Sequence, residues 1–76
     1  MNRILVVDDE PKIIEVVAAY LASRGFRVLS AGTGRQALEI LAREKVSLVL
    51  LDLMLPDISG EDVCLEIRRT SRVPVI

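Results

Sequence analysis

Two short apolar runs that each stop at aspartate constrain the fold of this chain more than any other feature. One run, residues 4–7, precedes Asp8 and Asp9, and another, residues 48–51, precedes Asp52. Neither run alternates apolar with polar residues, which is typical of strands covered on both faces, as in a parallel sheet. The pattern therefore predicts a parallel sheet with carboxylates placed directly after two of its strands.

Segments with helical periodicity follow the apolar runs. Between Pro11 and Gly25, apolar residues recur at helical spacing, with the proline in the first turn, where it is tolerated, and the glycine at the expected C-terminal stop. Thr33 and Gln36 match the capping-box pattern at the start of a second helix. Ser59 is a candidate N-cap for a third helix.

The order of these elements predicts an α/β fold. Residues 26–31 are expected to form the second strand, and residues 73–76 to begin a fourth. Strands that alternate with helices in this way favour right-handed crossovers and a doubly wound parallel sheet with helices on both faces. No internal repeat or flexible linker interrupts the order.

Length and charge argue against several classes of function. The 76 residues suffice for one small domain at most. Ten basic and 11 acidic residues give a net charge of −1, which offers no excess positive charge for nucleic acid or an anionic membrane. Charged residues interrupt the apolar runs too early for a signal peptide or a membrane span. The single cysteine, Cys64, cannot form an internal disulfide, so we expect a cytoplasmic protein.

Asp8, Asp9 and Asp52 are expected to lie together at one edge of the sheet. Ligands of open α/β sheets bind beyond the carboxyl ends of the strands, where these three side chains would sit. Like charges this close repel one another unless a cation lies between them, and oxygen ligands suit Mg²⁺, with Mn²⁺ as a substitute. The residues alone leave an alternative open, in which the aspartates only end strands and start the next segments.

A carboxylate held beside Mg²⁺ can also act as a nucleophile. The metal withdraws charge from a phosphoryl group while a carboxylate oxygen attacks phosphorus in line, which gives an aspartyl phosphate. Asp52 is the better candidate because it stands alone at the end of a central strand, whereas Asp8 and Asp9 form a pair suited to holding the ion.

Two separated motifs resemble the receiver domain of bacterial two-component response regulators. Residues 4–10 read ILVVDDE, similar to the first strand and acidic pair of that family, and residues 52–60 read DLMLPDISG, similar to its phosphoacceptor loop. Residues 73–76 also fit the start of its fourth strand, so the resemblance covers the whole chain. It implies a flavodoxin-like, doubly wound parallel sheet with strand order 2-1-3-4-5, truncated here at the start of the fourth strand.

The resemblance implies a role for each matching residue. Asp52 is expected to accept a phosphoryl group from the phosphohistidine of a sensor histidine kinase, in a phosphorelay that uses Mg²⁺. Asp9 is expected to bind the metal directly, Asp8 mainly through water, and Met54 through its backbone carbonyl. The output domain of the parent protein is expected to bind DNA and regulate transcription, while this segment makes no contact with nucleic acid.

The family's site also includes a hydroxyl after the fourth strand and a lysine after the fifth, for which residues 1–76 offer no counterpart. We therefore expect residues 1–76 to be the N-terminal part of a single, incomplete receiver domain. The open edge of the fourth strand also predicts self-association by strand pairing or segment exchange.

Two other functions remain open from the sequence. An engineered or fragment half-domain that acts only as a folding or assembly unit would keep the same carboxylates. A Mg²⁺-dependent phosphotransferase or phosphatase is less favoured, because it needs a catalytic acid two residues beyond its nucleophile, where this chain has Met54. The leading hypothesis is a phosphoacceptor that is the substrate of a kinase and not itself an enzyme.

Overall fold

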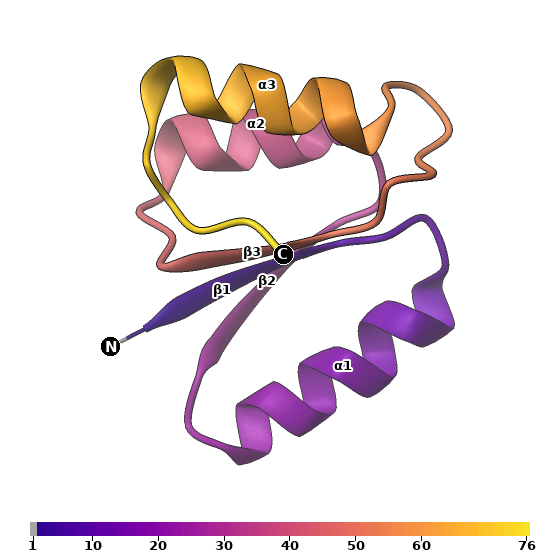
Figure 1. Cartoon of the computed structure of the whole chain (residues 1–76). Helices are drawn as coiled ribbons and strands as arrows, with labels where there is room; N and C mark the ends of the chain where they lie inside the picture. Colours follow the sequence, from indigo (N-terminus) through magenta and orange to yellow (C-terminus); the bar gives the residue numbers. More distant parts are fainter. Residues whose placement is uncertain (1) are drawn as a thin grey trace.

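Three parallel strands form the centre of the computed structural model, which describes residues 2–76 (Figure 1). The strands lie side by side in the order β2-β1-β3. Along the chain the elements are β1 (Arg3–Val7), α1 (Pro11–Ser23), β2 (Arg27–Ala31), α2 (Gly34–Arg43), β3 (Leu48–Leu51) and α3 (Gly60–Thr70). This confirms the predicted alternation of strands and helices and the first three positions of the expected strand order.

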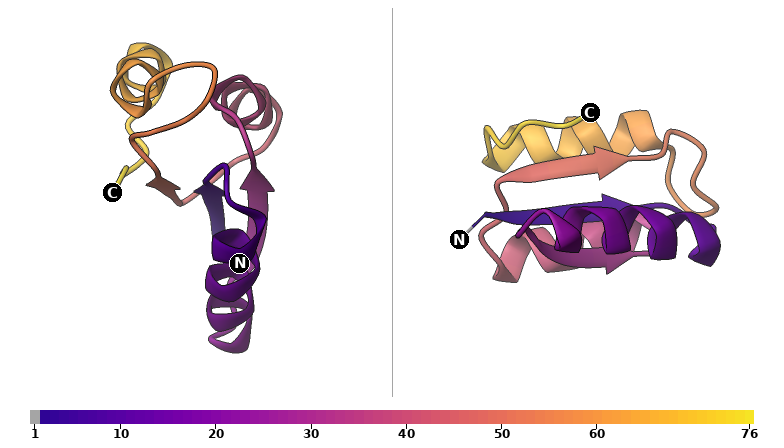
Figure 2. Two further views of the ribbon diagram at one scale, coloured as in Figure 1. Left: turned by 90° about the vertical axis from the view of Figure 1, so that its right-hand side faces the viewer. Right: turned by 90° about the horizontal axis from the view of Figure 1, so that it is seen from below.

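The helices cover both faces of the sheet. α1 lies on one face, whereas α2 and α3 lie side by side on the other (Figures 1 and 2). The first crossover runs from β1 to β2, and the second runs in the opposite direction, from β2 past β1 to β3. Right-handed connections that run in opposite directions place their helices on opposite faces of a parallel sheet. The doubly wound architecture predicted from the sequence is therefore confirmed.

The central strand β1 is also the most buried. Ile4, Leu5, Val6 and Val7 are each exposed by 4% or less. Both faces of this strand are covered, which explains why its sequence does not alternate apolar with polar residues. On the side of α2 and α3 the core extends from β1 to buried residues of other elements: Ala31, Ala37 and Val49.

Side-chain caps define the starts of α2 and α3. The Thr33 hydroxyl accepts a hydrogen bond from the Gln36 amide at 3.1 Å, as the capping-box pattern predicts. The Gln36 side chain accepts from the Gly32 amide at 2.8 Å, one residue earlier than the amide of the N-cap itself. The Ser59 hydroxyl accepts from the Asp62 amide at 3.1 Å, so its predicted cap is also confirmed.

The second strand begins at Arg27 and not at Phe26, which corrects the predicted boundary. The Phe26 amide donates to the Leu21 carbonyl at 3.1 Å, and the Gly25 amide donates to the Ala22 carbonyl at 3.0 Å. These two hydrogen bonds, together with the positive φ of 89° at Gly25, form a Schellman ending of α1. Phe26 therefore completes the end of the helix and cannot open the strand.

Residues 73–76 pair with β3 in parallel through a bridge between Val75 and Val49, at the predicted start of a fourth strand. The Val49 amide donates to the Pro74 carbonyl at 2.9 Å, and the Ile76 amide donates to the Val49 carbonyl at 2.9 Å. Pro74 has no amide hydrogen to extend this ladder. The segment still lies beside β3, where the fourth strand was expected.

No helix within residues 2–76 is both long enough and apolar enough to cross a membrane.

Gly60 allows the loop after β3 to fold back tightly. Its amide donates to the Leu53 carbonyl at 2.9 Å. A β-carbon at position 60 would lie 2.6 Å from the Asp52 carbonyl oxygen and would also collide with the Leu53 α-carbon. The close approach of two backbone segments therefore requires glycine at this position.

We predict that Gly60→Ala lowers the free energy of unfolding by about 1–3 kcal/mol, because the added methyl group collides with backbone that cannot move aside. Urea denaturation followed by circular dichroism measures this loss. Gly32→Ala is the matched control, since the nearest atom to its added methyl group lies at an ordinary contact distance of 3.6 Å. Equal losses in the two variants would contradict the proposed crowding at Gly60.

Candidate metal centre

The pairing of β1 with β3 brings two of the predicted site residues to the same edge. Val7 is the register partner of Leu51. The Asp52 amide donates to the Val7 carbonyl at 3.0 Å, which extends the ladder by one residue. Asp8 directly follows Val7, and its amide donates to the Ala31 carbonyl of β2 at 3.0 Å. Both aspartates are thus held by the sheet itself and not by a mobile loop.

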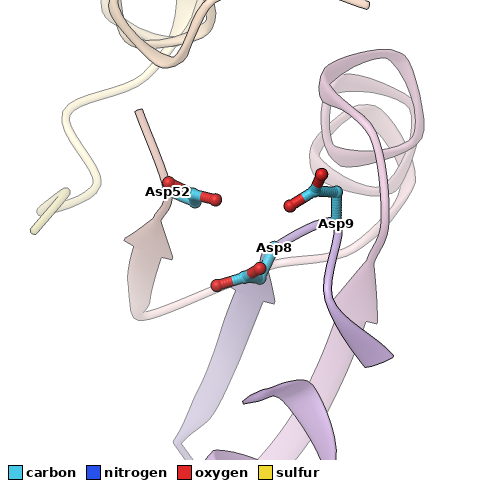
Figure 3. A group of neighbouring side chains, drawn as sticks. All are labelled: Asp8, Asp9 and Asp52. Atoms are coloured by element: carbon cyan, nitrogen blue, oxygen red, sulfur yellow. The ribbon is translucent and has the colours of Figure 1, made fainter. Parts of the chain in front are cut away.

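The structure brings Asp8, Asp9 and Asp52 together. Each contributes a carboxylate oxygen to a cluster in which all three atoms lie within 4.8 Å of one another. Figure 3 shows Asp9 and Asp52 facing each other across a gap, with Asp8 at the end of β1 below them. Asp8 and Asp52 are half-buried, and Asp9 is exposed. The three groups are close enough to share one small cation.

Local hydrogen bonds orient two of the carboxylates. One oxygen of Asp8 accepts from the Glu10 amide at 2.9 Å, and one oxygen of Asp52 accepts from the Met54 amide at 3.0 Å. Within residues 2–76, neither aspartate accepts a further hydrogen bond at its second oxygen. Each carboxylate is therefore fixed by one oxygen while the other remains available to a ligand.

No basic side chain of the described residues neutralises this cluster. The two ion pairs in this part of the chain join Arg3 to Glu44 and Arg69 to Glu66, away from the aspartates. Three carboxylates within a few ångströms repel one another, and a divalent cation would relieve that repulsion. The donor set consists only of oxygen atoms, which fits Mg²⁺ better than a metal that prefers nitrogen or sulfur.

Met54 lies two residues beyond Asp52, at the start of the loop that leads to α3. Its side chain is 82% exposed, and its amide is used to orient Asp52. The resemblance to receiver domains implies a metal-binding role for the backbone carbonyl of Met54. Lys12, the basic residue nearest to the acidic pair along the chain, forms no ion pair within the described residues.

Asp57 belongs to a contact that sequence reasoning missed. Its carboxylate accepts hydrogen bonds from the amides of Gly34 and Arg35, which are 23 and 22 residues earlier in the chain. In the sequence Asp57 carried only the signal of a turn residue, within Pro56-Asp57-Ile58-Ser59-Gly60. No local sequence pattern around Asp57 indicates that its carboxylate would bind the start of α2.

Two hollows border different parts of the molecule. One of about 1130 Å³ lies near the amino ends of the strands, where Arg3, Ser47 and Arg72 contribute to its wall. A smaller one of about 260 Å³ lies beside α1 and includes Asp8 and Asp52 in its wall. The carboxylate cluster therefore borders the smaller of these two hollows, and cavity volume alone would not identify it. Its charge and its position at the carboxyl ends of the strands identify it instead.

Comparison with known proteins connects this arrangement to a family. A sequence model of the response regulator receiver domain matches residues 4–76. The chain is 46% identical over 75 residues to the DNA-binding response regulator MtrA of Mycolicibacterium smegmatis, and the match covers 99% of this chain and 33% of MtrA. The chain thus spans about a third of the length of the curated relatives that it matches.

Solved structures are similar over nearly the whole chain. The response regulator protein TrrA of Thermotoga maritima, crystallised in complex with Mg²⁺-BeF, has a TM-score of 0.93 and 39% sequence identity, covering 99% of this chain and 66% of TrrA. The complex of the histidine kinase ThkA with TrrA gives the same TM-score, identity and coverage.

The sheet has the order β2-β1-β3, with an acidic pair after β1 and an aspartate after β3. The family model matches residues 4–76, which include all of these features. The chain belongs to the response regulator receiver domain family.

Proposed function

We propose that the chain is a phosphoacceptor module of a two-component system, in which Asp52 receives a phosphoryl group from the phosphohistidine of a sensor histidine kinase. The observation that carries this proposal is the position of Asp52 at the end of β3, within 4.8 Å of the carboxylate oxygens of Asp8 and Asp9. The similarity to TrrA, which was crystallised with the histidine kinase ThkA, supports the choice of donor.

The residues of the cluster fit Mg²⁺. Asp9 and Asp52 would bind the ion directly, Asp8 mainly through water, and Met54 through its backbone carbonyl. The similarity to TrrA, crystallised with Mg²⁺-BeF, supports this assignment. When bound, the ion would withdraw charge from the phosphoryl oxygens as the transfer proceeds.

Asp52 supplies the nucleophile in this reaction. One carboxylate oxygen is held by the Met54 amide, and the other forms the new bond to phosphorus. The bond between phosphorus and the ring nitrogen of the donor histidine breaks, and the electron pair returns to that nitrogen. The products are an aspartyl phosphate on this chain and an unmodified histidine on the kinase.

The chain is the acceptor in this transfer, and we assign it no enzymatic turnover. A phosphotransferase that passed its own aspartyl phosphate onward would need an acid at position 54, where Met54 presents an exposed thioether.

We place the protein in the cytoplasm, as a segment that binds a kinase and not nucleic acid. Residues 1–76 would form the N-terminal part of a receiver domain whose parent carries a DNA-binding output, as MtrA is named to do.

Self-association is a second candidate property of this chain. Residues 73–76 pair with β3 on one side, and no segment within residues 2–76 pairs with their other side. Ile76 is 77% exposed, and the α1 residues Val16 and Tyr20 are 68% and 59% exposed. An open backbone edge and exposed apolar side chains each favour association between copies.

We predict that Asp52→Asn abolishes phosphorylation, because an amide is a far weaker nucleophile than a carboxylate. Intact mass spectrometry after incubation with an acyl phosphate and Mg²⁺ measures the addition of one phosphoryl group. Asp62→Asn is the control, since Asp62 lies in the first turn of α3, outside the cluster. An adduct that persists in Asp52→Asn would show that the acceptor is another residue.

Loss of one direct ligand should weaken metal binding. We expect Asp9→Ala to raise the dissociation constant for Mg²⁺ by at least about tenfold, which corresponds to about 1.4 kcal/mol. Calorimetric titration with MgCl₂ measures the change, with Glu10→Gln as a neighbouring acidic control outside the cluster. The site assignment fails if the two substitutions weaken binding equally.

If copies pair through residues 73–76, the average mass should rise with concentration. Multi-angle light scattering over a range of concentrations measures this rise, and Val75→Pro should reduce it because proline cannot donate to a strand ladder. A monomeric mass at the highest concentration would exclude this mode of association.

A further inference from the structure

Asp57 connects the loop after β3 to the start of α2. One carboxylate oxygen accepts from the Gly34 amide at 2.8 Å, and the other accepts from the Arg35 amide at 3.0 Å. The amide of Gln36, next along the helix, is capped by Thr33. The first three amides of α2, which have no partner within the helix, are therefore all satisfied, two of them by a residue from another part of the chain.

Packing brings the two segments into close contact at this point. A β-carbon at Gly34 would lie 2.8 Å from a methyl group of Val63 and 3.1 Å from the β-carbon of Ile58. Gly34 is itself buried. The absence of a side chain at position 34 lets the loop approach the helix end closely enough for the Asp57 carboxylate to reach two amides.

The loop has few other polar attachments. At one end the Met54 amide binds Asp52, and at the other the Gly60 amide binds the Leu53 carbonyl. Asp57 is the only residue of positions 53–58 with a polar side chain. It therefore provides the side-chain hydrogen bonds that connect the middle of this loop to the rest of the protein.

We propose that Asp57 is a positioning residue, which anchors the loop on α2 so that Asp52 and the Met54 carbonyl keep the arrangement needed to bind a divalent metal. Within the described residues, the Asp57 side chain bonds to α2 and not to the carboxylate cluster. The part of this inference that concerns the metal rests on the proposed function, whereas the anchoring of the loop does not.

The charge of Asp57 agrees with this role. Hydrogen bonds from the backbone amides of Arg35 and Gly34 lower the pKa of its carboxyl group below the ordinary value of 3.8. Because the folded-state pKa is depressed, the stabilising contribution is complete above the ordinary pKa and is lost as the pH falls through the lowered value. The anchor is thus fully charged at neutral pH, where its electrostatic attraction to the amino end of α2 is favourable.

Hydrogen exchange of the metal-free chain separates anchoring of the loop from simple capping of the helix. Asp57→Ala removes both bonds to α2, whereas Thr33→Ala removes the other cap of α2 and leaves the loop attached. We expect the amides of Met54 and Gly60 to exchange about tenfold faster in Asp57→Ala than in Thr33→Ala. Faster exchange confined to α2 in both variants would reduce Asp57 to a helix cap and overturn the proposal.

Mg²⁺ titration of the same variants provides the functional measurement. We expect the dissociation constant to rise by about tenfold in Asp57→Ala, as for loss of a residue that orients a ligand, and to remain unchanged in Thr33→Ala. Asp57→Asn, whose carbonyl oxygen can still accept a hydrogen bond, should fall between wild type and Asp57→Ala. It also provides the test if Asp57→Ala does not fold.

The two experiments distinguish failure of this inference from failure of the proposed function. If the wild-type chain binds Mg²⁺ and Asp57→Asn binds it equally well, Asp57 does not position the site. If the wild-type chain binds no Mg²⁺, the metal assignment is wrong, and the exchange of Met54 and Gly60 alone decides whether Asp57 anchors the loop.

Discussion

The hydrogen-bonded ladder between β1 and β3 is the constraint on which the site depends. Val7 pairs with Leu51, and the Asp52 amide continues the ladder to the Val7 carbonyl. A shift of this register by one residue would turn every side chain of β3 to the opposite face and separate Asp52 from Asp8. The apolar core that fixes the register therefore also fixes the distances between the carboxylates.

Burial of apolar side chains stabilises the fold at this edge of the sheet, whereas the clustered negative charges destabilise it. The side chains of β1 are almost fully removed from water, yet the strand ends in two adjacent aspartates, and a third follows β3 without a basic partner among the described residues. Such an arrangement does not favour stability on electrostatic grounds. Local violations of the rules for a stable fold are expected where a protein has a function, and here the violation coincides with the candidate metal centre.

Much of the fold could be predicted from local patterns. Unalternated apolar runs predicted the buried strands, and Thr33, Gln36 and Ser59 predicted two helix starts, because each of these signals acts over a few residues. The proximity of the three aspartates also followed from the topology, since the carboxyl ends of neighbouring parallel strands meet at one edge.

Features that depend on more distant contacts were not accessible from the sequence. The contact of Asp57 with α2 joins positions 23 residues apart and depends on the absence of a side chain at Gly34. The boundary at Phe26 depended on which of two partners would bind its amide, the end of α1 or the sheet. Residues 73–76 pair with β3 through one bridge, and apolar composition alone could not indicate how far this pairing extends.

A crystal structure of the chain grown with Mg²⁺ and beryllofluoride would decide whether Asp52 is the phosphoacceptor beside a metal site. We expect beryllofluoride on a carboxylate oxygen of Asp52, with Mg²⁺ bound by Asp9, Asp52 and the Met54 carbonyl. Beryllofluoride on Asp8 or Asp9, or an ordered cluster of carboxylates without a cation at saturating Mg²⁺, would contradict it.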